Sequence, residues 1–335
     1  MVLLDAIYIN NSGGKVLLDY LIENLESSGM RVHYLLDSRV FQNHPIINSG
    51  NDVTYLKSGL RSRHAFYKEN RNKFSKVLCF GNLPPSLKLN AEVSTYFHQQ
   101  LFIKIPDDIS LINKITIGIK MMVLHCIKKN TDRWIVQSEN VRNGLSEKYN
   151  LKKETVQVIP FFPPLPPVDH IIKNKYKFVY ISNVGTHKNH QRLIEGFCKF
   201  YDKFKIGELG LTISENATFE VELIKSLQQR GYPIINFGFI GRNELSEIYA
   251  SSEFLVFPSL SESFGLGLVE AIDSGCKVIG ADLPYTYAVC QPSITFNPFS
   301  VDEIAEAFEK SLKPDIKPTI AKVHNQIEIL IKLLQ

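Results

Sequence analysis

The sequence predicts an α/β fold made of two Rossmann-like domains that face each other across a cleft. Short apolar runs alternate with amphipathic stretches along all 335 residues, a pattern typical of parallel sheets covered by helices. A proline-rich stretch, residues 160–167, interrupts this alternation near the middle of the chain. Because proline cannot donate a backbone hydrogen bond to a helix or a sheet interior, we interpret the stretch as a linker between two similar halves.

In the first half, apolar runs of strand length predict buried strands, and stretches with helical periodicity predict helices between them. The predicted strands are residues 2–9, 31–36, 76–80, 93–97, 133–137 and 156–159, and the predicted helices are residues 15–28, 111–129 and 139–149. The second half repeats this pattern. Its predicted strands are residues 177–182, 209–213, 234–238, 254–257, 277–280 and 294–296, and its predicted helices are residues 190–204, 218–230, 243–251, 265–274, 300–312 and 318–334.

The length of the chain is sufficient for two domains, each with its own hydrophobic core. We therefore predict an N-terminal Rossmann-like domain over residues 1–160 and a linker over residues 161–175. A second Rossmann-like domain follows over residues 176–317, and a C-terminal helix over residues 318–335.

Two glutamates flank the start of a predicted helix in the second half. Glu262 lies in the turn after the buried run 254–257, and Glu270 lies in the helix that follows. Ligands of open α/β sheets bind at this edge, where strand ends meet helix N-termini. Carboxylates accept hydrogen bonds from sugar hydroxyls, while the backbone N–H groups of residues 264–267 would face an anion. The combination predicts a sugar nucleotide, in which a diphosphate joins two hydroxyl-bearing groups.

Residues 261–271, with the sequence SESFGLGLVEA, resemble the E-x7-E signature of retaining GT-B glycosyltransferases of the family-4 type. The resemblance implies a GT-B fold whose second domain binds a nucleoside-diphosphate sugar and whose first domain binds the acceptor. It implies that Glu262 holds sugar hydroxyls and Glu270 the ribose, and that the C-terminal helix crosses back to the first domain. The remaining donor-site residues that it implies here are Ser263, Phe264, Gly265 and Leu266.

A second segment resembles the same family. After the predicted strand 177–182, the family has an arginine and, five residues later, a lysine that clamp the diphosphate. Lys188 matches the lysine, whereas Asn183 occupies the position of the arginine, which removes one cation from the clamp. Because helix N-termini disfavour cations, a lysine at this place also indicates an anion between them. An ordinary surface lysine is the alternative.

The first half contributes two weaker signals. Gly13 and Gly14 lie at a strand–helix junction, where the backbone can come close to a ligand phosphate. The resemblance assigns this turn to the donor diphosphate or to the acceptor side, while Asp37, after the second strand, keeps a dinucleotide-binding interpretation open. His98 follows the predicted strand 93–97, and the resemblance implies that it contacts the donor sugar near the reacting carbon. A structural histidine is the alternative.

The first half is also basic. Residues 1–160 carry 21 Lys and Arg against 14 Asp and Glu, and the excess is densest in residues 57–76. An anionic membrane surface fits this segment, and a solvated basic face is the alternative; nucleic acid is not predicted, because the segment lacks the cues of a nucleic-acid reader. Residues 111–129 carry an apolar face with period 3.6, for which we favour core packing over an interfacial helix.

Together with these signals, the resemblance implies a retaining hexosyltransferase that uses a nucleoside-diphosphate sugar and no cofactor or metal, with Glu262, Lys188 and His98 as its catalytic residues. The acceptor would be a saccharide, lipid-linked, in polysaccharide or O-antigen assembly. The five cysteines lack metal-ligand spacing and no signal peptide precedes the first strand, so we expect a cytoplasmic protein, peripheral on the inner face of the cytoplasmic membrane. Two alternatives remain: a nucleotide-sugar epimerase on the same scaffold, and a non-catalytic partner subunit that binds a nucleotide sugar.

Overall fold

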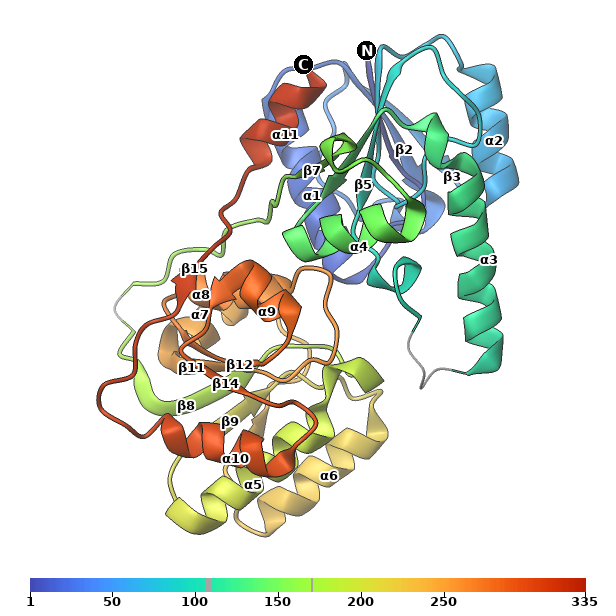
Figure 1. The fold of residues 1–335 in the computed structure, drawn as a ribbon. Helices are drawn as coiled ribbons and strands as arrows, with labels where there is room; N and C mark the ends of the chain where they lie inside the picture. Colours follow the sequence, from blue (N-terminus) through green and yellow to red (C-terminus); the bar gives the residue numbers. More distant parts are fainter. Residues whose placement is uncertain (106–109, 170) are drawn as a thin grey trace. The chain divides into compact units, whose positions relative to one another are not determined.

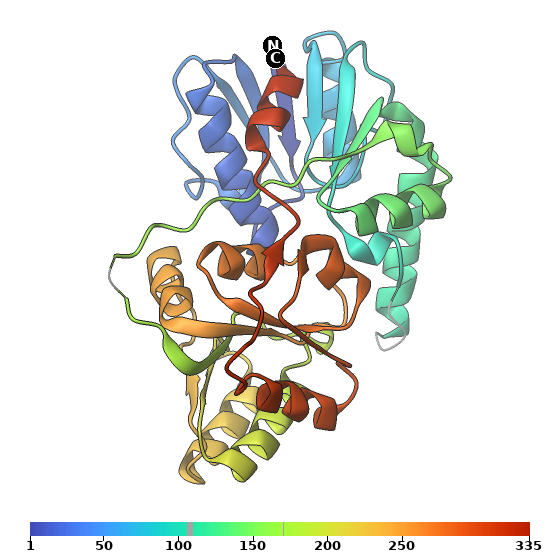
Figure 2. The same cartoon turned by 60° about the vertical axis from the view of Figure 1, so that its left-hand side comes forward.

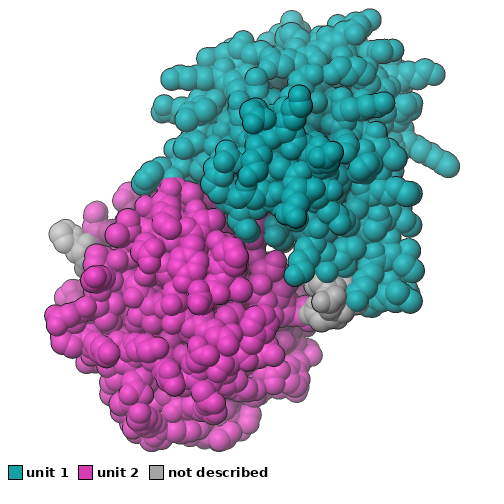
Figure 3. Space-filling model, viewed as in Figure 1, with its two compact units in different colours: residues 1–163, 324–335 teal, residues 164–323 magenta. Residues whose placement is uncertain are grey.

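The computed structural model describes residues 1–105, 110–169 and 171–335. The chain divides into two compact units, shown in Figure 3: Met1–Pro163 with His324–Gln335 forms unit 1, and Pro164–Val323 forms unit 2. Each unit contains one parallel sheet with helices around it, as Figure 1 shows, so the α/β prediction is confirmed. The cleft between the two units stays a prediction.

Unit 1 is built on a sheet of order β3-β2-β1-β4-β5-β6-β7, in which all neighbouring strands are parallel. The chain adds β2 and β3 on one side of β1 and then β4 to β7 on the other side, so the strand order reverses between β1 and β4. Ligands of α/β sheets bind at such a switch point. The strands are β1 (Val2–Ala6), β2 (Val32–Asp37), β3 (Asp52–Leu56), β4 (Lys76–Cys79), β5 (Glu92–Phe97), β6 (Arg133–Val136) and β7 (Val156–Val158). The helices are α1 (Ser12–Ser27), α2 (Leu60–Glu69), α3 (Leu111–Ile127), α4 (Glu139–Tyr149) and α11 (Ile327–Leu334).

The C-terminal helix α11 belongs to unit 1, as predicted, and both chain termini lie in this unit (Figure 2). Its backbone is tied to the unit by two hydrogen bonds: Gln326 N donates to Pro160 O at 2.8 Å, and Lys76 Nζ donates to Leu333 O at 3.0 Å. The helix is shorter than the predicted 318–334. Part of that range forms β15 (Ile320–Ala321), which pairs with β13 (Cys290–Gln291) in unit 2.

The first unit runs to Pro163, beyond the predicted end at residue 160. The reason is that Phe161 and Phe162, the first residues of the predicted linker, are buried. The Phe161 ring lies 5.2 Å from the Tyr96 ring and 6.1 Å from the Phe80 ring, centroid to centroid. Two aromatic side chains between prolines therefore fasten the linker to the core of unit 1.

The basic segment 57–76 contains α2, which the sequence did not predict as a helix, and one of its cations is not on the surface. Arg63 is only 2% exposed, and its Nε donates to Asp5 Oδ2 at 2.6 Å. Its two terminal nitrogens donate to Leu83 O and Pro84 O, each at 2.7 Å. Arg63 thus holds β1 and the loop after β4 together, which corrects its assignment to a basic surface.

Helix α3 packs on the core only at its C-terminal end, through Leu124 and Ile127, and its predicted apolar face is exposed, so the favoured interpretation of that face was wrong. Leu124 is the only described residue of the helix that is buried. Four large side chains of the predicted face are exposed: Ile112 76%, Ile115 55%, Ile119 54% and Met122 61%. Periodicity locates an apolar face on a helix, but it does not say what covers that face.

Unit 2 is built on a sheet of order β10-β9-β8-β11-β12-β14, again with parallel neighbours and with its switch point between β8 and β11. These strands are β8 (Asn174–Tyr180), β9 (Glu208–Leu211), β10 (Ile234–Asn236), β11 (Ser252–Phe257), β12 (Lys277–Ala281) and β14 (Ile294–Phe296). The helices are α5 (His190–Phe204), α6 (Thr218–Gln229), α7 (Arg242–Ser251), α8 (Leu266–Asp273), α9 (Pro284–Val289) and α10 (Val301–Lys310). The order of both sheets matches the Rossmann-like prediction.

Candidate functional site

The loops that follow β8 and β11 bring two of the predicted catalytic residues together. Lys188 ends a 3-10 turn, Thr186–Lys188, after β8, and Glu262 lies in the loop between β11 and α8. Lys188 Nζ lies 2.6 Å from Glu262 Oε1, and the two side chains are 21% and 12% exposed. The structure therefore forms a partly solvated cation–carboxylate pair at the switch point of the second sheet.

Buried polar groups fix the two loops to each other. Tyr180, the last residue of β8, donates its hydroxyl hydrogen bond to Lys188 O at 3.0 Å, and its oxygen lies 2.8 Å from Ser259 Oγ. Leu260 N donates to His187 O at 2.7 Å. The position of the Lys188–Glu262 pair is thus set by backbone and buried contacts rather than by the two side chains alone.

Asn189 anchors the same region and was not predicted. It is buried, and its Nδ2 donates to Pro258 O at 3.1 Å and to Pro298 O at 2.7 Å. Its φ of 61° lies in the left-handed region, which asparagine tolerates better than most residues. An asparagine directly before a stretch of helical periodicity can be recognised in a sequence, but the groups that its side chain contacts cannot.

Neither Asn183 nor His190 adds a positive charge to the site at pH 7. Asn183 is exposed, and because its side chain is uncharged it supplies no cation to the predicted clamp. His190, the first residue of α5, is buried against the Tyr180 ring at 4.9 Å. Burial, and then the nearby Lys188, lower the pKa of His190 to about 4, so the imidazole is neutral at pH 7. Lys188 is the cation that the loop after β8 supplies.

Glu270, in α8, is paired with a residue that the sequence analysis missed. Its side chain is 6% exposed, and Oε1 accepts a hydrogen bond from Arg242 Nη1 at 3.0 Å. Burial raises the pKa of Glu270, and the Arg242 guanidinium acts in the opposite direction. Arg242 is the first residue of α7, and the argument applied to Lys188, that a cation is disfavoured at a helix N-terminus, would have identified it.

The turn before α8 offers backbone rather than side chains. The Phe264 ring is buried, whereas Ser263 and Leu266 are half-buried. Gly265 caps the helix with a φ of 82°, a conformation that requires glycine. At Gly267, a Cβ atom would lie 3.3 Å from the Tyr249 hydroxyl and 3.6 Å from Ile181 O, so the first turn of α8 runs close to the end of β8.

In unit 1 the structure brings His98 and Gly14 together. Gly14 lies in the first turn of α1, and a Cβ atom there would be 3.4 Å from His98 Cε1. Gly13 is exposed, with no atom close to where its Cβ would lie. His98 N donates to Asn82 Oδ1 at 2.7 Å, and burial lowers the pKa of the His98 imidazole to about 4. A neutral histidine thus lies beside the glycine turn at the edge of the first sheet.

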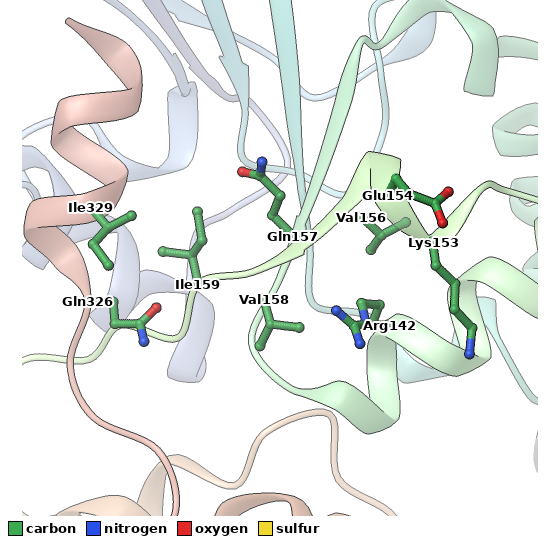
Figure 4. Close-up of a pocket in the computed structure, with 9 residues that line it drawn as sticks. All are labelled: Arg142, Lys153, Glu154, Val156, Gln157, Val158, Ile159, Gln326 and Ile329. Atoms are coloured by element: carbon green, nitrogen blue, oxygen red, sulfur yellow. The ribbon is translucent and has the colours of Figure 1, made fainter.

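A separate hollow in unit 1 has a volume of about 450 Å³ and lies against β7 and the start of α11 (Figure 4). It is lined by Arg142, Lys153, Glu154, Val156, Gln157, Val158, Ile159, Gln326 and Ile329. Among the described residues, its lining includes none of the predicted site residues. In the same described parts of the chain, no three His, Cys, Asp or Glu side chains gather as a metal site would require.

Comparison with known proteins relates the second unit to one family. Residues 165–325 match the family model described as Glycosyl transferases group 1. Mannosylfructose-phosphate synthase of Agrobacterium fabrum is 24% identical over 173 residues, 46% of this chain and 38% of that protein. The O-antigen chain mannosyltransferase RfbU of Salmonella typhimurium is 27% identical over 175 residues, 51% of this chain and 46% of that protein. The match thus spans less than half the length of these relatives.

Solved structures share the fold of nearly the whole chain. Sucrose-phosphate synthase from Thermosynechococcus elongatus superposes with a TM-score of 0.68 at 18% identity, over 93% of this chain and 89% of that one. Anabaena Alr3699/HepE, in complex with UDP and glucose, superposes with a TM-score of 0.63 at 13% identity, over 93% and 89% of the two chains. Similarity at such low identity shows the fold alone, and the predicted GT-B fold is confirmed.

Proposed function

We propose that this chain, whose second unit carries a group 1 glycosyltransferase domain, transfers a hexose with retention from a nucleoside-diphosphate sugar to a saccharide acceptor. One observation carries the proposal, the 2.6 Å pair of Lys188 Nζ and Glu262 Oε1 at the switch point of the second sheet. The donor has a diphosphate and a hydroxyl-bearing sugar directly joined. An ammonium and a carboxylate side by side match that junction, because one attracts the phosphate and the other accepts hydrogen bonds from the hydroxyls.

The proposed roles follow from where charge develops during transfer. The transition state resembles an oxocarbenium ion, with negative charge growing on the departing diphosphate. Lys188 and the backbone N–H groups of residues 264–267 would stabilise that charge, and Glu262 would hold the hydroxyls of the sugar. Glu270 would hold the ribose, with Arg242 orienting its carboxylate. With Asn183 in place of an arginine, the backbone N–H groups bear more of this task.

In unit 1, His98 would contact the donor sugar near the reacting carbon, and the turn with Gly13 and Gly14 would border the donor diphosphate or the acceptor. A neutral His98 can donate or accept one hydrogen bond to a hydroxyl without competing with the cations for the phosphate. We propose a lipid-linked saccharide acceptor in polysaccharide or O-antigen assembly. One relative is named as an O-antigen chain mannosyltransferase, which supports the O-antigen part of this proposal.

Location and metal use are further parts of the proposal. In the parts of the chain that the structure describes, no helix combines the length and apolar character of a membrane span. We propose action at the cytoplasmic face of the membrane, and catalysis without a metal ion, as the family resemblance implies. Retention of activity in excess EDTA is the measurement that checks the latter.

The donor is the first point to test. UDP-, GDP- and dTDP-sugars are screened for a rise in melting temperature, because a ligand that binds only the folded protein stabilises it by mass action. The best donor is then titrated by calorimetry against wild type and Glu270→Ala. We expect the variant to bind about 10- to 150-fold more weakly, the loss of a charge-assisted hydrogen bond of roughly 1.5–3 kcal/mol.

The matched control is Glu253→Ala, which removes a carboxylate that is also paired with a cation, Lys277, at the opposite end of β11. Its donor affinity should equal that of wild type. Equal affinity in a folded Glu270→Ala variant would remove Glu270 from the site. Consumption of the donor without any acceptor and with epimerised product would favour an epimerase, and binding without consumption a non-catalytic subunit.

A further inference from the structure

Helix α3 presents an apolar face to solvent over residues 112–122. The side chains of Ile112, Ile115, Ile119 and Met122 recur at three- and four-residue spacing, and each is more than half exposed. Contiguous apolar patches on a protein surface mark interaction sites, whereas single exposed apolar side chains do not. Figure 1 shows α3 on the periphery of unit 1, beside α2. This face has no part in the proposed sugar transfer.

The surroundings of this face are basic. Residues 111–127 contain no Asp or Glu, and they include Lys114 and Lys120. Arg61 and Lys68 lie on the neighbouring α2, and both are exposed. Within the described part of the chain, no carboxylate lies within ion-pair distance of Arg61, Lys68 or Lys120. The apolar face is thus accompanied by Arg61, Lys68 and Lys120, three cations without a carboxylate partner in the part of the chain that the structure describes.

A groove of about 540 Å³ runs between α2 and α3. Its residues are Leu60, Arg61, His64, Ala65, Lys68, Ser86, Val123 and Ile127. The walls are mainly apolar, from Leu60, Val123 and Ile127, and Arg61 and Lys68 supply positive charge beside them. An apolar groove with adjacent cations is complementary to an acyl chain joined to a phosphate.

We propose that α3 and α2 form a docking surface for an anionic lipid bilayer, with α3 lying in the plane of the interface and the groove taking one phospholipid. At 17 residues, α3 is shorter than the roughly 20 apolar residues that a membrane span needs, whereas interfacial helices bury only one face. Pairing of α3 with a second copy of itself would bring Lys120 against like charge. Anionic headgroups instead complement both the cations and the apolar row.

The test measures co-sedimentation of the full chain with vesicles of phosphatidylglycerol and phosphatidylcholine, mixed about 30:70, against vesicles of phosphatidylcholine alone. The variants are Ile115→Glu/Ile119→Glu, which charges the apolar face, and Arg61→Glu/Lys68→Glu, which reverses the charge at the groove. The control is Phe219→Glu, which charges a side chain 64% exposed on α6 of unit 2.

We expect wild type and Phe219→Glu to bind the anionic vesicles. Raising the salt concentration from about 0.05 to about 0.5 M should release both proteins, because salt screens the attraction between the cations and the lipid headgroups. Both α2 and α3 variants should lose at least tenfold in partitioning, while their thermal unfolding stays like that of wild type. Equal binding to neutral vesicles, or unchanged binding of the α3 variant, would overturn the proposal. So would a wild-type dimer in sedimentation velocity that Ile115→Glu/Ile119→Glu converts to monomer without any vesicle binding, since a second copy would then be the partner.

Discussion

The buried ion pair of Arg63 and Asp5 allows the sharpest prediction about stability. Arg63 donates to Asp5 Oδ2 at 2.6 Å and to the carbonyls of Leu83 and Pro84 at 2.7 Å, and both charged side chains are at most 2% exposed. In Arg63→Met, the apolar stem is kept but every donor is lost, so a buried carboxylate keeps only weaker partners. Removing one member of a buried pair costs about 3–5 kcal/mol, and we expect that loss of unfolding free energy in unit 1.

The chain carries a convenient probe for this measurement. Trp134, its single tryptophan, is buried in the core of unit 1, so its fluorescence reports the unfolding of that unit in the full chain. With a urea slope of roughly 2 kcal/mol per M, the expected loss moves the unfolding midpoint down by about 2 M. Following one unit with one probe also avoids treating a two-unit chain as two-state.

Two controls accompany it. Arg61→Met removes an exposed arginine from the same helix, and we expect a change within about 0.5 kcal/mol. Asp5→Leu/Arg63→Met removes both charges and should recover part of the loss, since a buried pair replaced by apolar groups is often neutral. A midpoint for Arg63→Met within about 0.3 M of wild type, at an unchanged slope, would refute the reasoning.

Two further predictions concern packing and pH. Gly196→Ala should destabilise unit 2 by about 1–3 kcal/mol, measured by hydrogen exchange in α5, because the new Cβ would lie 2.5 Å from Ile304 Cγ2. Gly118→Ala is the control, and because there is open space around Gly118 it should not lower stability. Equal effects of the two substitutions would refute the packing argument. Burial lowers the pKa of His98 to about 4, below its unfolded value near 6.5, so the unfolded chain binds the proton more tightly and stability falls as pH drops from 6.5 toward 4. The urea midpoint of unit 1, followed by Trp134 fluorescence, should therefore fall less between pH 7 and pH 5 in His98→Phe than in wild type, and equal falls would exclude His98 as a cause.

Local sequence patterns were sufficient for the architecture because strands and helices are governed by neighbours along the chain. An apolar run of four to six residues forms a buried parallel strand wherever the sheet later places it, as residues 254–257 do in β11. The elements missed include β3, α2 and α9: β3 begins with an exposed Asp52, α2 is too basic to show an apolar face, and α9 has only six residues. The candidate site was accessible for the same reason, since Lys188 and Glu262 each follow a predicted strand.

The sequence by itself determined two Rossmann-like sheets and the strand–turn–helix segments that carry Glu262, Glu270 and Lys188. Only the tertiary structure decided which charges meet: Lys188 with Glu262 across 74 positions, Arg63 with Asp5 across 58, and Arg242 with Glu270 across 28. It also decided that the apolar face of α3 is exposed. The reason is physical, because propensity and periodicity act over a few residues, whereas burial and ion pairing depend on which elements the sheet order makes neighbours.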